Sequence, residues 1–472
     1  MKTLAKPTPA ITNRALLGLA VPAMVALAAE PLFGIVDAAM IARVGTESLA
    51  ALAVASTVIG MSVWVLNFLV FGTTSEVARL HGAGRDERIG AYLPQVMAVA
   101  IVLGVLLAAA QWLLCDEIYR LMGARPEVIA AGRNYYRIRV CGIPLVLLGF
   151  VGMGALRGLQ NTRIPMIAGL GVSILNGLLD YALIFGVPGW IPAYGMEGAA
   201  WATLAGEVVW CAFLFGALWG LPAYRATRPR MPRFDPGELR AIFHVSRDLF
   251  LRTGSLLLTY TVATAVAGRV GTAALAGHEI ALKMWMLGAF MLDGFAIAGQ
   301  AVVAKELGAG RIENVRAASR TLVRWGVGVG VLLLALFGLG RGAWIGVFDP
   351  EPAVRAQVLA IAGWIIFSQP LNAVVFVLDG ILMGANDLRF LRNAMFGAAG
   401  VFALFTGASW VFGWGLRGLW AGIIAEIVVR FGTNLWRFRG DAWIRAGGPP
   451  PEEAEIEAAL AGDVAPMGVG ER

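Results

Sequence analysis

Apolar runs dominate this sequence and recur about twelve times between residues 15 and 438. Each run is longer than the roughly 20 residues that an α-helix needs to cross a bilayer. Charged residues make up only 15% of the chain, whereas soluble domains carry roughly 25%. The first run is too long for the apolar core of a cleaved signal peptide and contains acids. We therefore expect an all-α polytopic membrane protein with twelve transmembrane helices.

Cations gather on one side of the predicted membrane. If the N-terminus lies inside, most lysines and arginines fall in inner segments, whereas the outer turn at 189–196 has none. This asymmetry predicts a multi-pass protein of the plasma (inner) membrane with both termini in the cytoplasm. It explains the net charge of +7 by orientation in a lipid bilayer, without a nucleic acid partner. The exceptions are Arg133, Arg137 and Arg139, at the outer end of the fourth run.

The two halves of the chain are related by a repeat with an offset of 226 residues. The segment Arg43–Thr46 returns as Arg269–Thr272, and Gly82–Arg85 returns as Gly308–Arg311. Further pairs at this offset are Pro126 and Pro352, Gly158 and Gly384, and Arg163 and Arg389. Each half holds six spans, an even number, so both repeats share one orientation. We expect two parallel six-helix lobes related by a pseudo-twofold axis along the membrane normal, the architecture of an alternating-access transporter.

A proline-rich stretch divides the chain near its middle. It predicts a cytoplasmic linker at 221–240, between an N-terminal lobe at 1–220 and a C-terminal lobe at 241–440. Beyond about Ala446 the sequence becomes rich in Gly, Pro, Ala and Glu and has no apolar run. We predict that 441–472 form a disordered, acidic cytoplasmic tail.

Acids within the apolar runs are the first candidates for function. Glu30 and Asp37 lie in the first run, where a charge costs roughly 2.5–3.5 kcal/mol on insertion scales. The fifth run has a single charge, Asp180, and Asn176 lies one helical turn before it. Asp37 and Asp180 each lie about eight residues before the outer end of their run, roughly 12 Å deep. Thr203, on the sixth run, reaches a similar depth.

These four polar side chains, from three helices at one depth, predict a site: Asp37, Asn176, Asp180 and Thr203. Two carboxylates that share an apolar cavity cannot both ionise at low cost, so the pair is suited to load and release a proton. The alternative is that each acid is satisfied separately, in its own cavity or by solvent. Glu207, four residues after Thr203, and Glu30 are secondary candidates for the same cavity.

Other kinds of chemistry are not indicated by the sequence. The three cysteines and three histidines are scattered, which predicts neither a metal cluster nor a disulfide framework. The glycine-rich stretches at 82–88 and 308–316 lack the Lys-Ser/Thr pair of a nucleotide-binding loop. We expect no enzyme activity and no cofactor other than a coupling ion. Asp293 and Asp379 fall towards the inner ends of their runs and are interpreted as capping or packing residues.

Several segments resemble the multidrug and toxic compound extrusion (MATE) family, and its DinF-like branch in particular. The resemblance covers residues 14–440, and the matching segments are Pro31–Asp37, Gly154–Pro165, Asn176–Asp180, Gly198–Thr203 and Leu292–Ala296. It implies a secondary active multidrug efflux antiporter that works by alternating access. In such members a span-one aspartate, a span-five Asn-xxx-Asp pair and a span-six threonine form the cation-coupling site. These match Asp37, Asn176, Asp180 and Thr203.

The resemblance also bears on the coupling ion. NorM-like relatives associated with sodium use acids of the C-terminal lobe, including a glutamate in span seven. Span seven here has no acid between Arg252 and Gly268, which favours proton coupling. Binding of Na+ by the same four N-lobe residues is the alternative.

The expected substrates are amphipathic, cationic organic compounds, exported by a monomer. A second hypothesis keeps the fold but makes the protein a flippase of lipid-linked precursors, as in distant relatives. Such a protein needs a cationic central cavity for a pyrophosphate headgroup. The charges that we place within the spans are mainly acidic, so the flippase ranks lower.

Overall fold

A computed structural model describes residues 11–221, 224 and 236–446, and within these ranges the protein is a bundle of α-helices without β-strands. The N-terminal lobe contains α1 (Asn13–Ala42), α2 (Thr46–Val65), α3 (Phe68–Gly82), α4 (Asp86–Leu113), α5 (Cys115–Leu121), α6 (Pro126–Val140), α7 (Ile143–Gly158), α8 (Arg163–Phe185) and α9 (Gly195–Gly220). The C-terminal lobe contains α11 (Pro236–Val270), α12 (Thr272–Gly308), α13 (Ile312–Leu339), α14 (Arg341–Val347), α15 (Pro352–Gly384), α16 (Leu388–Val411), α17 (Gly415–Arg439) and α18 (Ala442–Ala446).

The number of membrane spans agrees with the sequence. Across the described ranges, eleven helical segments are long and apolar enough to cross a membrane, and α1 supplies a twelfth. Two of the eleven are broken helices, α2–α3 and α6–α7. Their counterparts in the second repeat, α12 and α15, are continuous. The prediction of twelve helices in two lobes is confirmed, and the breaks belong to the N-terminal lobe alone.

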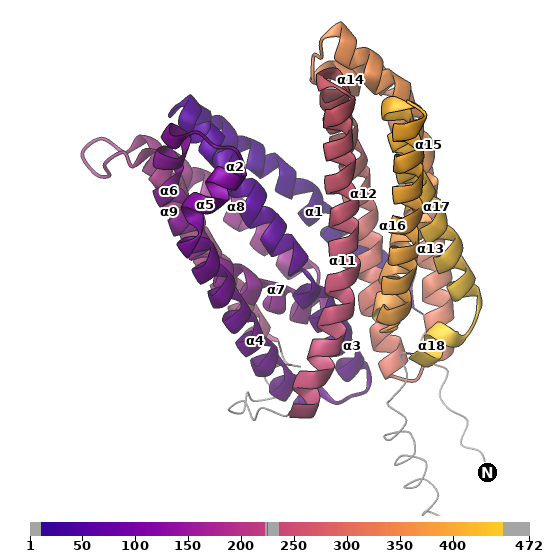
Figure 1. The fold of residues 1–472 in the computed structure, drawn as a ribbon. Coiled ribbons are helices and arrows are strands. Elements are labelled where there is room, and N and C mark those ends of the chain that lie inside the picture. The colour runs from indigo at the N-terminus through magenta and orange to yellow at the C-terminus, as the bar shows by residue number, and fades with distance from the viewer. Residues whose placement is uncertain (1–10, 222–223, 225–235, 447–472) are drawn as a thin grey trace, which may run out of the picture.

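The lobes cross at two glycines that the repeat relates to each other. A Cβ atom at Gly82 of α3 would overlap the Lys305 carbonyl of α12, and one at Gly308 of α12 would overlap the Arg79 carbonyl of α3. Both partners differ by the 226-residue offset, so the contact is reciprocal, as a twofold axis requires. The lobes lie side by side near this crossing and diverge towards the end that carries α5 and α14 (Figure 1).

The same offset governs packing inside each lobe. Gly104 of α4 lies against Pro144 of α7, and Gly330 of α13 lies against Pro370 of α15. A side chain larger than hydrogen at either glycine would meet the proline backbone. Equivalent small residues therefore set equivalent helix separations in both lobes, as is common where helices pack in lipid.

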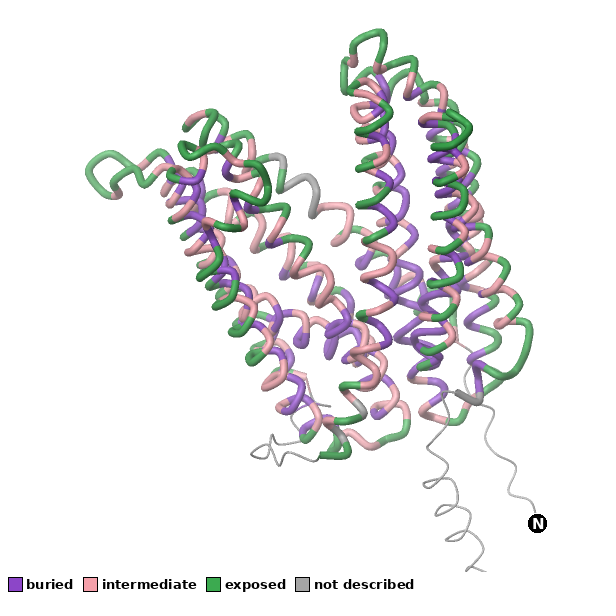
Figure 2. Tube along the Cα trace, in the orientation of Figure 1, coloured by how far each residue is buried: buried purple, intermediate pink, exposed green. Residues whose placement is uncertain are grey.

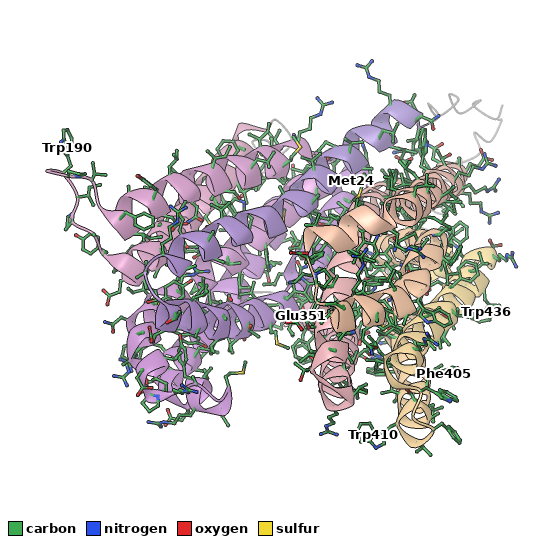
Figure 3. All side chains as sticks on the ribbon, turned by 90° about the horizontal axis from the view of Figure 1, so that it is seen from above. Met24, Trp190, Glu351, Phe405, Trp410 and Trp436 are labelled. Carbon is green, nitrogen blue, oxygen red and sulfur yellow. The ribbon has the colours of Figure 1, made fainter. Side chains whose placement is uncertain are left out.

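Helix α12 forms the centre of the molecule. Between 292 and 307 all of its residues except Asp293 and Lys305 are buried, and Figure 2 shows buried segments gathered where the lobes meet. Met24 of α1 packs against Gly294 of α12, and it is seen at the junction of the lobes in Figure 3. Trp190 is 89% exposed in the turn between α8 and α9 and projects from the end of the bundle (Figure 3).

Two predicted boundaries differ from the structure. The linker was placed at 221–240, but α11 already begins at Pro236. The tail was predicted to be disordered from 441, which is wrong for its first residues because 442–446 form α18. Trp443 is buried, stacks on Phe438 and donates to its carbonyl at 3.1 Å. The rest of the predicted tail, residues 447–472, lies outside the described ranges.

The glycine crossing predicts a sharp sensitivity to one methyl group. Gly308→Ala forces the α3 and α12 backbones apart and should destabilise the protein by roughly 1–3 kcal/mol, the usual cost of overpacking. Thermal unfolding of the purified protein measures this. Gly397→Ala on α16 is the control, because a Cβ there meets no atom within 4 Å. Equal unfolding temperatures for the two variants would contradict the crossing.

Candidate functional site

Three helices bring the four predicted site residues together. Asp37 lies five residues before the end of α1, and Asp180 lies five residues before the end of α8. Helix α8 packs between α1 and α9, with contacts to both. Asn176 shares the Asp180 face of α8, and Thr203 faces it from α9. The structure thus places these side chains in one cluster inside the N-terminal lobe, and their role in ion coupling stays a prediction.

The centre of the cluster is a contact between two carboxyl groups. The carboxyl groups of Asp37 and Asp180 lie close enough to interact directly with each other. An ionised carboxylate can only accept a hydrogen bond, so a hydrogen bond between the two groups requires a proton on one of them. Asp180 is only 1% exposed, and no amide, hydroxyl or cationic donor of the described chain reaches its Oδ1 atom. One shared proton would join the two groups across α1 and α8.

The Asn176 amide links this pair to α9. In one orientation its Nδ2 atom donates to Thr203 Oγ1 at 3.5 Å. In the other orientation the amide nitrogen donates to Asp180 Oδ2 at 3.2 Å, and the amide oxygen accepts from the Thr203 backbone N–H at 3.3 Å. The second orientation matches a donor to an acceptor at both ends of the amide. Thr203 Oγ1 itself donates to the Ala199 carbonyl at 2.9 Å, which fixes its rotamer.

Glu207, a secondary candidate, forms an ion pair beside this cluster. Its Oε1 atom accepts from Arg139 of α6 at 2.8 Å, and both side chains are largely buried. Arg139 also interacts electrostatically with Asp37 and Asp180. Together with Tyr135, the pair lines a cavity of about 240 Å³. The side chain of Glu30, the other secondary candidate, lies outside the described residues.

The break between α6 and α7 makes room for Glu207. A Cβ atom at Gly142, which lies in the break, would overlap the Glu207 carboxylate. Pro144 follows at the start of α7, where its missing N–H costs nothing. Pro370 is the repeat counterpart of Pro144 yet lies inside continuous α15, so proline alone does not break the helix. The glycine and the carboxylate beside it distinguish this lobe from the other.

The three arginines predicted at the outer end of the fourth run have different environments. Arg133 pairs with Asp116 of α5 at 2.8 Å and holds the pKa of that carboxyl group below its ordinary value. Arg137 stacks over the Trp112 ring at 4.5 Å. Only Arg139 turns into the lobe.

The C-terminal lobe contains a second buried charged cluster. Asp379 of α15 accepts from Arg252 of α11 at 2.6 Å, and from Arg430 and Asn434 of α17 at 2.5 and 2.8 Å. Glu426, which is fully buried, lies 3.5 Å from Arg430. The capping or packing role expected for Asp379 stays a prediction. Asp293 lies near the middle of α12 rather than towards its inner end.

Sequence reasoning missed the ion pairs that arginines form in both clusters. Acids remain the majority of the charges within the spans, but Arg139, Arg252 and Arg430 also lie inside the lobes and pair with some of them. An arginine within a long apolar run was the signal in the sequence that could have indicated a buried ion pair. For Glu426 and Arg430 the signal was their spacing of one helical turn. Among the described residues, no group of three or more His, Cys, Asp and Glu could hold a metal ion.

Comparison with known proteins gives the family of this chain. The sequence model of the MatE family matches residues 22–182 and 254–407. The chain is 30% identical to "Protein DETOXIFICATION 44, chloroplastic" of Arabidopsis thaliana, over 92% of this chain and 84% of that one. It is 30% identical to "Multidrug resistance protein PmpM" of Pseudomonas aeruginosa, over 87% and 88% of the two chains.

The expected DinF-like branch is also represented among the relatives. "DNA damage-inducible protein F" of Escherichia coli is 26% identical over 92% of this chain and 95% of its own. Among solved structures, a MATE protein in the bent conformation superposes with a TM-score of 0.80 at 23% identity, covering 92% of this chain and 96% of that one. This likeness supports the fold. The extent of the family match shows that the chain belongs to the MATE family of multi-pass membrane transporters.

Proposed function

We propose that this protein is a proton-coupled antiporter that exports amphipathic, cationic organic compounds by alternating access. The observation that carries the proposal is the Asp37–Asp180 carboxyl pair, which joins α1 to α8 in an apolar lobe. Uptake of one proton removes the repulsion between two buried carboxylates, and its release restores that repulsion. Protonation therefore changes the interaction between two helices.

Helix α1 connects this event to the other lobe. Asp37 lies near one end of α1, and Met24, about 20 Å away along the helix, packs against Gly294 of α12. A change in how α1 packs on α8 therefore reaches the junction of the lobes. Proton and substrate would bias one equilibrium between two lobe arrangements in opposite directions, which is the thermodynamic requirement for antiport.

The arrangement of the lobes supports an outward-facing state. The lobes are in contact at the end near α18, where α1 begins, and diverge at the other end (Figure 1). With both termini in the cytoplasm of an inner-membrane protein, as the cation asymmetry favours, this is an outward-facing arrangement. We propose that the monomer is the transporting unit, since each chain contains both lobes.

The ion pairs inside the lobes favour an antiporter over a flippase of lipid-linked precursors. A pyrophosphate headgroup in a central cavity requires cations there that are free to bind it. Arg139, Arg252 and Arg430, inside the lobes, are each engaged by a carboxylate at 2.8 Å or less, whereas Arg14, Arg163 and Lys305 line a cavity at the end of the bundle where α1 begins.

Asp37→Asn should reduce ion-driven export to background in reconstituted vesicles. Asparagine cannot take up a proton, but its amide can still donate to Asp180, so the unfolding temperature should stay close to that of the wild type. The matched control is Glu351→Gln, an exposed acid at the start of α15, which should transport normally. Wild-type flux in Asp37→Asn would remove the residue from the mechanism.

Thr203→Val should raise the ion concentration needed for half-maximal transport by about threefold to tenfold, the value of one neutral hydrogen bond. Valine keeps the shape of the side chain but loses the hydroxyl group, which donates to the Ala199 carbonyl and fixes the position of residue 203 beside Asn176. Thr203→Ser keeps the hydroxyl group and should behave like the wild type. Equal transport curves for the valine and serine variants would exclude the hydroxyl from the site.

Proteoliposomes that carry a fluorescent organic cation distinguish the two coupling ions. A pH gradient without sodium should drive transport, whereas a sodium gradient at equal pH should not. If sodium alone drives transport and Asp37→Asn abolishes it, the same residues bind Na+ and proton coupling is wrong.

A further inference from the structure

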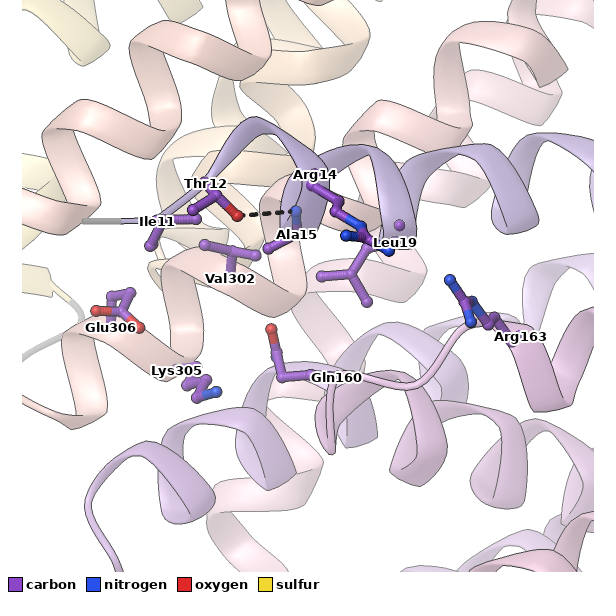
Figure 4. Close-up of a pocket in the computed structure, with 11 residues that line it drawn as sticks. Ile11, Thr12, Arg14, Ala15, Leu19, Gln160, Arg163, Val302, Lys305 and Glu306 are labelled. Atoms are coloured by element: carbon purple, nitrogen blue, oxygen red, sulfur yellow. Dashed lines mark hydrogen bonds between the residues drawn. The ribbon is translucent and has the colours of Figure 1, made fainter. Parts of the chain in front are cut away.

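A cavity of about 620 Å³ lies between the lobes at the end where α1 begins (Figure 4). The start of α1 forms one wall, and Gln160 in the turn after α7, with Arg163 at the start of α8, forms the second. Val302, Lys305 and Glu306 of α12 form the third wall. The first two walls belong to the N-terminal lobe and the third to the C-terminal lobe, so any occupant contacts both.

Three cations from three separate elements line this cavity: Arg14, Arg163 and Lys305 (Figure 4). None of them has an ion pair with any described residue. The single acid in the lining, Glu306, is already satisfied by Arg311 at 2.6 Å and Asn314 at 3.0 Å. The cavity therefore carries positive charge that the described protein does not neutralise.

The internal repeat shows one difference in compensation, which concerns Lys305. Arg14, Lys305 and Arg163 have counterparts in the other repeat at Arg240, Arg79 and Arg389. There, Arg79 forms an ion pair with Glu76 at 2.7 Å. The counterpart of Glu76 in the cavity is the apolar residue Val302. Both repeats keep the cations, but only the cavity lacks the acid that neutralises one of them.

We propose that this cavity binds a phosphate group, supplied either by the headgroup of an anionic phospholipid or by a free phosphate. Guanidinium and ammonium groups that converge from several sides are the donors that phosphate oxygens prefer. Basic pockets between transmembrane helices at the level of the headgroups suit such ligands. Cations at this end of the bundle also orient the protein in the membrane, but orientation does not require them to line one shared cavity.

The bound phosphate bridges the lobes. Gln160 already links them here, because its Nε2 atom donates to the Ala301 carbonyl of α12 at 2.9 Å. A phosphate held by Arg14 and Arg163 on one side and Lys305 on the other adds charge-assisted hydrogen bonds to this link. It stabilises the arrangement in which this end is closed, and it leaves the cavity when the lobes separate. This inference does not depend on which ion drives transport.

Thermal unfolding of the purified full chain in neutral detergent tests the proposal. Phosphatidylglycerol, phosphatidylcholine and inorganic phosphate are titrated separately, with chloride at matched ionic strength as the baseline. A ligand that binds the folded protein raises its unfolding temperature in proportion to occupancy. We expect a rise of several degrees with phosphatidylglycerol or inorganic phosphate and a smaller rise with zwitterionic phosphatidylcholine. A response to phosphatidylglycerol alone identifies the headgroup as the source, and a response to inorganic phosphate identifies the free anion.

Variants of the cavity and of its repeat counterpart provide the matched comparison. Arg14→Gln, Arg163→Gln and Lys305→Gln should each weaken the titration about tenfold, the value of one charge-assisted hydrogen bond. Arg240→Gln and Arg389→Gln remove the same charge from equivalent positions outside the cavity and should titrate like the wild type. Lys305→Arg keeps the charge and should retain the response. This separates loss of binding from loss of folding.

The proposal is overturned by any of three results. The wild type could respond to neither phosphatidylglycerol nor inorganic phosphate. The counterpart variants could lose the response as fully as the cavity variants, which would indicate general attraction to a basic surface. Lys305→Arg could lose the response together with Lys305→Gln, which would indicate that the shape of lysine matters and not its charge.

Discussion

Charge buried in an apolar bundle has to be compensated, and the two lobes of this protein do so differently. In the C-terminal lobe Asp379 is held by two arginines and an asparagine from two neighbouring helices, so its compensation is permanent. In the N-terminal lobe Asp37 and Asp180 face each other, and Arg139, which acts electrostatically on both, is already paired with Glu207. Breaking the first arrangement would leave an unpaired buried charge at a cost of several kcal/mol. Under the proposed proton coupling the second would change with pH, which would make the C-terminal lobe the fixed part and the N-terminal lobe the responsive part.

The two lobes also differ in the continuity of their helices. Helices α12 and α15 run without interruption through the C-terminal lobe, whereas their counterparts are broken at Leu66–Asn67 and at Cys141–Gly142. The second break lies beside the Arg139–Glu207 pair, next to the carboxyl cluster. Helix ends leave backbone groups without intrahelical partners, and these can rearrange at lower cost than a continuous helix can bend. The two repeats therefore differ, because the helices that are continuous in the C-terminal lobe are broken in the N-terminal lobe.

Much of this organisation can be predicted from the sequence because it follows from patterns that repeat along the chain. Long apolar runs predict the spans, and the 226-residue offset predicts the pseudo-twofold axis. Depth along the spans brings Asp37, Asn176, Asp180 and Thr203 to one level, where the structure also places them. Ion pairs between distant segments could not be predicted in this way. Arg139 and Glu207 are 68 residues apart in the sequence, and Arg252 and Asp379 are 127 residues apart. Trp443 was missed for another reason, since a single buried indole can order a segment whose composition predicts disorder.

The reciprocal glycine crossing has a mechanical consequence. Helix α12 has 37 residues, so it is about 55 Å long, and the crossing lies at one of its ends. Each degree of tilt at the crossing therefore displaces the far end by about 1 Å, by the geometry of a rigid rod. Under the proposed alternating access, the lobes would pivot at this crossing, where no side chain separates the two backbones. Sub-ångström changes in packing near Gly82 and Gly308 would then be amplified into the distance between the lobes at the opposite end.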